Sequence, residues 1–132
     1  MSSNFRRSPD SSRRVSRVTC PHLLSMKQHG RPIAAVTAYD YPMAVLADTA
    51  GLDFVLVGDS SASVTMGHEN TIPIGLDELE MNLRAVRRGL RRALLVADLP
   101  FGYCHEESAC VTAAVTASIP LTTRMLSTVI GV

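Results

Sequence analysis

The chain has 132 residues, 46% of them hydrophobic and 19% charged, a composition typical of one globular domain with a modest core. The formal net charge is +1, aromatic residues make up 5% and tryptophan is absent, so we expect no nucleic-acid partner. No apolar run approaches the roughly 20 residues needed to span a bilayer, and we expect no membrane association.

The first residues, 1–17, are rich in arginine and serine and contain one acid, Asp10. Such a segment cannot bury enough apolar surface to fold, so we predict a disordered basic tail. The same composition describes a mitochondrial presequence, although Pro9 and Asp10 would interrupt its helix. The expected location is therefore cytoplasmic, with mitochondrial import as the alternative.

The next elements alternate between helix and strand. Residues 18–30 predict a short helix that ends at a glycine, and residues 33–37 predict a buried strand. A helix over residues 42–50 follows, with Asp40 close enough to act as its N-cap. Its expected apolar face consists of Met43, Leu46, Ala47 and Ala50. This order is typical of a strand–helix–strand unit with parallel pairing.

The two most apolar stretches lie at residues 54–57 and 93–97. Each is an unbroken apolar run, which predicts a strand buried on both faces of a parallel sheet. The first run is followed by Asp59 and Ser60, and the second by Asp98. Because ligands bind beyond the carboxyl ends of parallel strands, these three polar residues form the candidate site.

A long polar loop, residues 61–75, separates these two strands in the sequence. Loops of this length usually serve a function, so we predict a lid or a binding loop. A helix follows and ends at Gly89, with Asp77 and Glu80 as its capping box. Its expected core stripe consists of Leu79, Leu83 and Val86.

Several arginines gather near the end of this helix. We interpret them as a solvated face that complements the helix dipole, with a phosphate or partner site as the alternative. They are Arg84, Arg87, Arg88, Arg91 and Arg92. After the second apolar strand, a last helix is expected over residues 106–118, and no strand rich enough to continue the sheet follows it.

Two aspartates at the ends of neighbouring strands suit a divalent cation. Neighbouring parallel strands lie about 4.8 Å apart, so Asp59 and Asp98 could share one ion. Mg²⁺ prefers oxygen ligands and is often held by one or two carboxylates together with the substrate. Ser60 would offer a hydroxyl or a backbone N–H to a substrate carboxylate. The alternative is that each aspartate only caps the loop or helix that follows it.

Five motifs appear in order between residues 18 and 103. They are Val-Thr-Ala-Tyr-Asp-Tyr-Pro at 36–42, Leu-Val-Gly-Asp-Ser at 56–60, Gly-His-Glu-Asn-Thr-Ile-Pro at 67–73, Arg-Ala-Val-Arg-Arg-Gly at 84–89 and Val-Ala-Asp-Leu-Pro-Phe-Gly at 96–102. This series resembles the ketopantoate hydroxymethyltransferase family, whose members are also named 3-methyl-2-oxobutanoate hydroxymethyltransferases.

The resemblance implies an α/β fold, the TIM-type (β/α)8 barrel, of which this chain would contain about three units. It implies a homo-oligomer and the transfer of a one-carbon unit from 5,10-methylenetetrahydrofolate to 3-methyl-2-oxobutanoate, giving 2-dehydropantoate for pantothenate synthesis. It also implies a Mg²⁺ ion, with Asp59 and Asp98 as metal ligands. The same two aspartates and Ser60 would bind the oxo acid.

The resemblance covers residues 18–103 and leaves 104–132 as a divergent C-terminal segment. The family's general base falls in the part that this chain lacks, so no catalytic residue is assigned and a truncated enzyme is expected. Two alternatives remain open. One is a non-catalytic fragment, and the other is a different Mg²⁺-dependent barrel enzyme for 2-oxo acids, of the phosphoenolpyruvate mutase and isocitrate lyase group.

Overall fold

The computed structural model describes residues 16–104, 106, 108–109, 111–112 and 128–130. Most of the predicted basic tail and of the predicted helix over 106–118 lies outside these residues. The described elements follow in the order α1 (Cys20–Gln28), β1 (Ala35–Thr37), α2 (Tyr41–Thr49), β2 (Phe54–Val57), α3 (Ser61–Val64), α4 (Leu76–Gly89), β3 (Leu94–Asp98) and β4 (Thr128–Ile130). In this described part of the chain, no helix is long and apolar enough to cross a bilayer.

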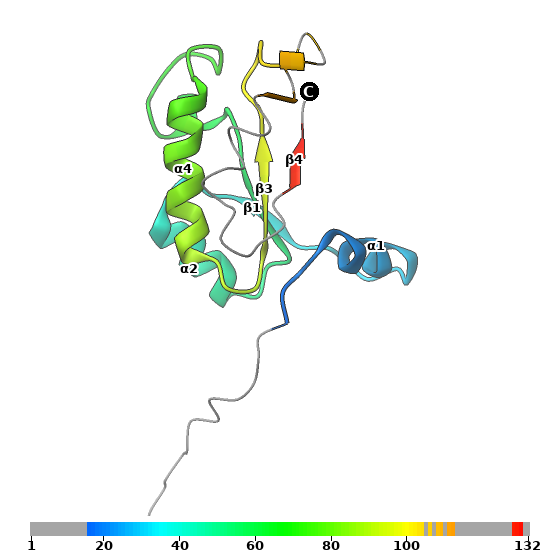
Figure 1. The fold of residues 1–132 in the computed structure, drawn as a ribbon. Coiled ribbons are helices and arrows are strands. Elements are labelled where there is room, and N and C mark those ends of the chain that lie inside the picture. The colour runs from blue at the N-terminus through cyan, green and yellow to red at the C-terminus, as the bar shows by residue number, and fades with distance from the viewer. Residues whose placement is uncertain (1–15, 105, 107, 110, 113–127, 131–132) are drawn as a thin grey trace, which may run out of the picture.

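The strands form one parallel sheet in the order β1-β2-β3-β4, with helix α2 between β1 and β2 and helices α3 and α4 between β2 and β3 (Figure 1). Val36 is opposite Val55 across the first pair, and Val57 is opposite Ala97 across the second. This arrangement confirms the predicted α/β fold class of parallel strand–helix units. The sheet places the carboxyl ends of β2 and β3 side by side at one edge.

The fourth strand contradicts the prediction that no strand continues the sheet after residue 98. β4 pairs in parallel with β3, and Ile130 is opposite Asp98. Three residues are too few to show a period in the sequence, although Thr, Val and Ile all favour extended backbone. The strand is recognisable only because β3 offers its edge as a partner.

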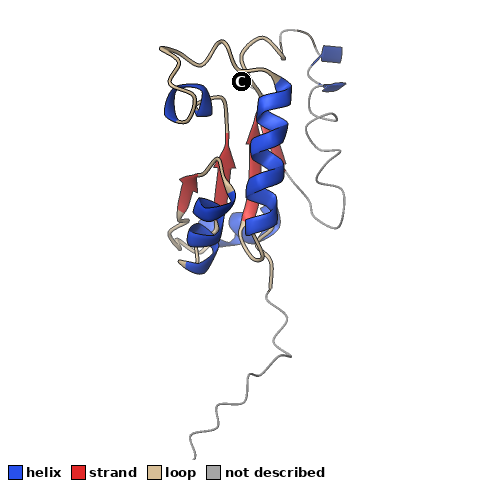
Figure 2. Ribbon diagram, turned by 90° about the vertical axis from the view of Figure 1, so that its left-hand side faces the viewer, coloured by secondary structure: helices blue, strands red, loops and turns tan. Residues whose placement is uncertain are grey.

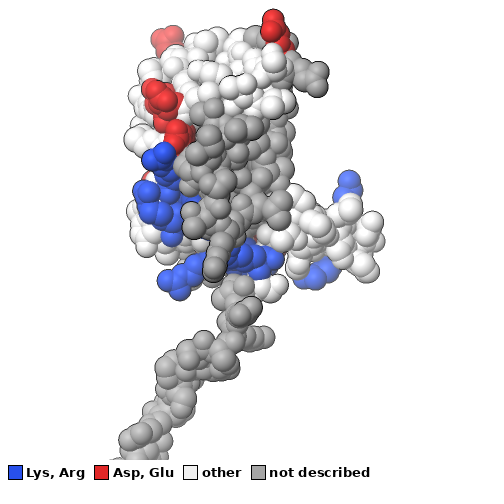
Figure 3. All heavy atoms as spheres, viewed as in Figure 1, with Lys and Arg blue, Asp and Glu red and all other residues white. Residues whose placement is uncertain are grey.

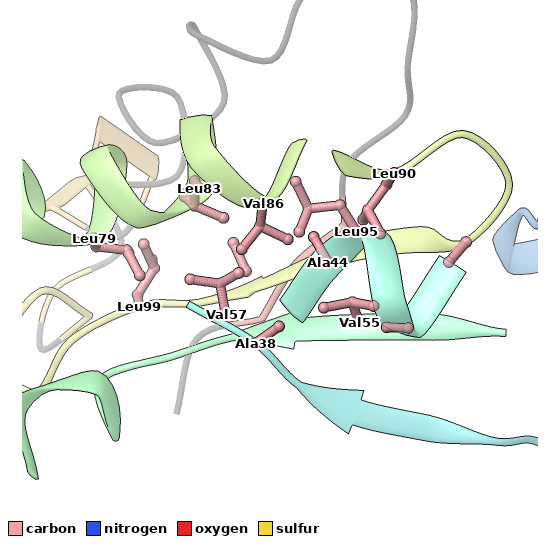
Figure 4. Close-up of a cluster of buried hydrophobic side chains, with 13 residues drawn as sticks. Ala38, Ala44, Val55, Val57, Leu79, Leu83, Val86, Leu90, Leu95 and Leu99 are labelled. Atoms are coloured by element: carbon pink, nitrogen blue, oxygen red, sulfur yellow. The ribbon is translucent and has the colours of Figure 1, made fainter. Parts of the chain in front are cut away.

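Helices α2 and α4 cover one face of the sheet (Figure 2). The main core lies between these helices and the sheet, and Figure 4 shows its side chains meeting in one layer. From the strands it contains Val55, Val57, Leu95 and Ala97, and from the helices Ala44, Ala47, Leu79, Leu83 and Val86. The predicted stripe of the third long helix is therefore confirmed, because its three members are fully buried here.

The opposite face of the sheet is covered less completely. Along β2, Val55 and Val57 are fully buried, whereas Phe54 and Leu56 are only partly buried. The prediction that this strand is buried on both faces is therefore wrong in the described structure. Among the residues that the structure describes, α1 and Val18 pack near the second face. A groove of about 360 Å³ remains between α1 and the sheet, lined mainly by Leu23, Leu24, Ile33, Phe54, Leu94 and Val96.

Helix α2 begins as predicted, but of its expected apolar face only Ala47 is buried. Asp40 is its N-cap, and its Oδ1 accepts a hydrogen bond from the Met43 N–H at 2.8 Å. The buried residues are Ala44 and Ala47, whereas Met43 and Leu46 are exposed. The small face is buried because α4 crosses α2 closely: a Cβ added at Gly89 would lie 2.7 Å from the Ala44 Cβ.

Two further corrections concern the segment between β2 and α4. The predicted polar loop contains the short helix α3, which occupies Ser61–Val64. Helix α4 begins at Leu76, one residue before the predicted cap, and its N-cap is Gly75. Glu78 Oε2 accepts a hydrogen bond from the Gly75 N–H at 3.0 Å, while Glu80 forms an ion pair with Arg84. The predicted Asp77–Glu80 capping box is therefore wrong by two residues.

The charges of α4 are divided between its two ends. Asp77 and Glu78 lie in its first turn, and Arg87 and Arg88 lie in its last. In Figure 3 the acidic side chains lie toward the upper end of the molecule and the basic ones below them. This distribution complements the helix dipole, and Arg84, Arg88 and Arg91 are exposed, as expected of a solvated face.

Arg92 differs from the other arginines because it joins the end of α2 to the start of β2. Its guanidinium donates hydrogen bonds to the carbonyl oxygens of Gly51 and Leu52, at 3.0 and 2.9 Å. It also pairs with Asp53 Oδ1 at 3.1 Å. The backbone N–H of Arg92 donates a hydrogen bond to Asp48 Oδ1 at 2.9 Å. These bonds fix the turn that leads from α4 into β3.

This cluster predicts a loss of stability in acid. Burial alone would raise the pKa of Asp53, but hydrogen bonds from the Ala34 N–H and from Arg92 outweigh burial and lower it. A lowered folded-state pKa contributes stability above the ordinary value of about 3.9, and this stability is lost as the pH falls through the folded value. We expect urea titrations of Asp53→Asn to show a loss of roughly 1–3 kcal/mol near neutral pH.

The difference between Asp53→Asn and the wild type should shrink progressively below about pH 4, because the carboxyl of the unfolded chain is then protonated, and it should vanish once the pH is below the folded-state pKa as well. Asp77→Asn is a matched control, since Asp77 is exposed and should change stability by no more than about 0.5 kcal/mol. A difference that is the same at both pH values would show that the Asp53 charge does not support the fold.

Candidate active site

The candidate residues lie at the carboxyl ends of neighbouring strands. Asp98 is the last residue of β3, and Asp59 comes two residues after the end of β2. Ser60 follows directly and is the N-cap of α3. Because β2 and β3 are paired in parallel, these side chains share one edge of the sheet. The structure therefore brings the three predicted site residues to the same end of two adjacent strands.

Asp98 is the most perturbed carboxylate of this group. Its Oδ1 is buried and has no hydrogen-bond partner among the residues that the structure describes, although the residue as a whole is only partly buried. Burial raises the pKa of Asp98, and the negative charge of Asp59 raises it further. Two carboxylates that interact in this way disfavour being charged together. The pair is therefore strained electrostatically until a proton or a cation compensates it.

Gly58 gives the Asp98 side chain its space. A Cβ added at this glycine would lie 3.2 Å from the Asp98 Cβ and 3.3 Å from its Oδ2. The backbone of Gly58 is not in the left-handed region, so the glycine is needed for the close approach and not for its conformation. The Gly-Asp pair after β2 thus sets the position of both carboxylates.

The two aspartates have the chemistry of a cation site. Carboxylate oxygens are the ligands that Mg²⁺ prefers, and an unpartnered buried oxygen such as Asp98 Oδ1 is able to accept an ion. Among the described residues, no group of three or more His, Cys, Asp or Glu side chains is placed to hold a metal. The pair would therefore supply two ligands and leave other coordination positions to water or substrate.

Tyr39 is a fourth residue at this end of the sheet, and it is not among the site residues predicted from the sequence. It lies two residues beyond the end of β1, and its hydroxyl oxygen is 2.7 Å from Ser60 Oγ. Both side chains are partly buried. The contact joins residues 21 positions apart, so the only signal in the sequence is that both follow strands predicted to be neighbours.

Comparison with known proteins shows to which family the chain is similar. The family model described as ketopantoate hydroxymethyltransferase matches residues 17–125. An Arabidopsis thaliana protein named 3-methyl-2-oxobutanoate hydroxymethyltransferase 1, mitochondrial, is 55% identical over 100 residues, which are 75% of this chain and 29% of the relative. A Magnetococcus marinus protein named 3-methyl-2-oxobutanoate hydroxymethyltransferase is 57% identical over 86 residues, or 65% of this chain and 32% of the relative.

The matched region extends past residue 103, where the five motifs end, to residue 125. The chain spans about a third of the length of these curated relatives. The match nevertheless covers most of the chain, including all four residues at the strand ends. The chain therefore belongs to the ketopantoate hydroxymethyltransferase family.

Proposed function

We propose that this chain carries the metal-binding and oxo-acid-binding part of a 3-methyl-2-oxobutanoate hydroxymethyltransferase. The observation that supports this proposal most directly is the buried, unpartnered Oδ1 of Asp98 beside the charge of Asp59. A polar atom left unpaired in the interior is costly, and sites of this kind occur where a ligand completes the pairing. The resemblance to the family implies that this ligand is Mg²⁺.

Asp59 and Asp98 are the residues that would hold Mg²⁺. When bound, the ion would draw electron density from the keto oxygen of the substrate and so make the neighbouring carbon more acidic. Ser60 would donate a hydrogen bond to a carboxylate oxygen of the oxo acid. Gly58 keeps Asp98 in place, since any larger side chain would compete for its space.

The remaining features of the proposal rest on the family resemblance of the sequence motifs. They are 5,10-methylenetetrahydrofolate as the one-carbon donor, a homo-oligomeric assembly, and 2-dehydropantoate as the product. The printed names of two plant relatives include the word mitochondrial, and those of bacterial relatives name no compartment. A cytoplasmic location, with mitochondria as the alternative, stays a prediction for this chain.

Calorimetry tests the proposal directly. We expect 3-methyl-2-oxobutanoate to bind the chain when Mg²⁺ is present and not when it is replaced by a chelator. Asp59→Asn should weaken this binding at least about tenfold, because a lost charged ligand is worth roughly 1.4 kcal/mol or more. Asp77→Asn removes an exposed carboxylate from the start of α4 and should bind as the wild type does. Equal binding with and without Mg²⁺ would contradict the proposal.

Isotope exchange separates binding from catalysis. In deuterated water, an enzyme that removes the proton at C3 of 3-methyl-2-oxobutanoate exchanges it without needing the folate. The family's general base is expected outside this chain, so we expect binding without exchange above the rate in buffer. Exchange that depends on Mg²⁺ and on Asp98 would instead show that the chain supplies its own base.

A further inference from the structure

We infer that Tyr39 is a positioning residue for the substrate: it orients the Ser60 hydroxyl so that the O–H of Ser60 points at a carboxylate oxygen of the bound oxo acid. The inference deepens the proposed function and rests on it. It starts from the contact between the Tyr39 hydroxyl oxygen and Ser60 Oγ, which are 2.7 Å apart.

Ser60 does not use its hydroxyl in the way that its place in the chain would predict. It is the N-cap of α3, and a serine at this position normally accepts a hydrogen bond from a backbone N–H of the first turn. Here the Ser60 side chain makes no such cap bond. Its hydroxyl is instead paired with Tyr39, which lies on a different strand end. The hydroxyl is therefore held toward the sheet edge and away from its own helix.

The direction of the hydrogen bond decides what Ser60 can offer to a ligand. Each hydroxyl has one proton, so one of the two oxygens must donate and the other must accept. If Tyr39 donates, the Ser60 proton is free to bind a third group. A substrate carboxylate is an acceptor only, and it selects this arrangement. Tyr39 thus fixes the hydroxyl rotor of Ser60 in the state that binds an anion.

The surrounding geometry agrees with this role. Tyr39 follows β1, Ser60 follows β2 and Asp98 ends β3, and these strands are consecutive in the sheet. The backbone at the end of β1 is tied to β2 by a hydrogen bond from the Ala38 N–H to the Leu56 carbonyl at 3.1 Å. Tyr39 is therefore held in register with the strand that carries Ser60, and the contact does not depend on a long loop.

A double-mutant cycle tests the inference. Calorimetry would measure the affinity for 3-methyl-2-oxobutanoate at saturating Mg²⁺ and, separately, the affinity for Mg²⁺ alone. We expect Tyr39→Phe to weaken oxo-acid binding about five- to tenfold, the loss of one oriented hydrogen bond, with Mg²⁺ affinity unchanged within about twofold. In a Ser60→Ala background, Tyr39→Phe should have no further effect. Tyr41→Phe is the matched control, because Tyr41 is 52% exposed on α2.

Three outcomes would overturn the inference. The first is a Tyr39→Phe chain that binds the oxo acid as tightly as the wild type. The second is a loss of oxo-acid affinity by the same factor with and without the Ser60 hydroxyl, and the third is a loss of Mg²⁺ affinity instead. If the wild-type chain binds no oxo acid at all, the proposed function fails and the inference falls with it. That result differs from the other three because it is seen before any variant is made.

Discussion

Replacing Asp98 with asparagine is expected to stabilise the ligand-free chain and to remove its response to Mg²⁺. The buried Oδ1 of Asp98 has no partner, and burial and Asp59 both raise the pKa of this carboxyl. A raised folded-state pKa means that stability is fully present below the ordinary value of about 3.9 and is lost as the pH rises through the folded value. Near neutral pH the charged carboxylate therefore destabilises the fold.

Asparagine has no charge, so Asp98→Asn removes the cost of burying a carboxylate and its repulsion by Asp59, and it should raise the free energy of unfolding. Ligand binding adds stability in the wild type: at a Mg²⁺ concentration about 100 times its dissociation constant, the gain is about 2.7 kcal/mol. The variant should show little of this gain. Urea titrations with Mg²⁺ and with a chelator measure both quantities on the same samples.

Asp59→Asn distinguishes the two contributions to the Asp98 pKa. It removes the neighbouring charge and leaves the burial of Asp98 unchanged, so it should stabilise the ligand-free chain less than Asp98→Asn does. Asp77→Asn should leave the Mg²⁺ response intact. A ligand-free Asp98→Asn chain that is less stable than the wild type, yet still stabilised by Mg²⁺, would show that Asp98 supports the fold and does not bind the ion.

Truncating Leu83 to alanine is expected to have the largest effect on stability. Leu83 is fully buried at the centre of the layer between α4 and the sheet, as Figure 4 shows. Removing a buried leucine side chain loses its transfer free energy and leaves a cavity, a loss of roughly 2–5 kcal/mol. Small domains are stable by only about 5–15 kcal/mol in total, so this loss is a large fraction of the free energy of unfolding.

Met81→Ala is the matched control for Leu83→Ala, because it removes a side chain of similar size from the same helix. Met81 is 60% exposed, and its truncation should change the unfolding free energy by no more than about 0.5 kcal/mol. Circular dichroism during urea unfolding gives both values. Equal losses for the two variants would mean that the layer between α4 and the sheet is not the stabilising core.

The strands that define the site were the most predictable part of this structure. β2 was predicted at its observed bounds, because an apolar run that stops at Gly58 leaves little choice of boundary. The N-cap of α2 was also correct, because Asp40 before a proline is a strong local signal. The common location of Asp59 and Asp98 followed from the predicted carboxyl ends of β2 and β3.

The features that were missed depend on contacts between distant residues. The buried face of α2 is set by the close crossing at Gly89, and apolar character alone pointed to the larger residues Met43 and Leu46. β4 was missed because this three-residue strand is defined by its pairing with β3 and not by a pattern of its own. The bond between Tyr39 and Ser60 requires the strand order, which one-dimensional patterns do not contain. Local chemistry therefore predicted where side chains leave the sheet, and tertiary packing decided what they meet.

The apolar groove between α1 and the sheet affects how solution measurements on this chain should be interpreted. Leu24 is 56% exposed and Ile33 is 38% exposed along it. Apolar surface of this kind lowers colloidal stability, and concentrated samples tend to cluster through it. An apparent molar mass from light scattering that grows with protein concentration would then report nonspecific association through this groove. It would not report the quaternary structure of the longer relatives.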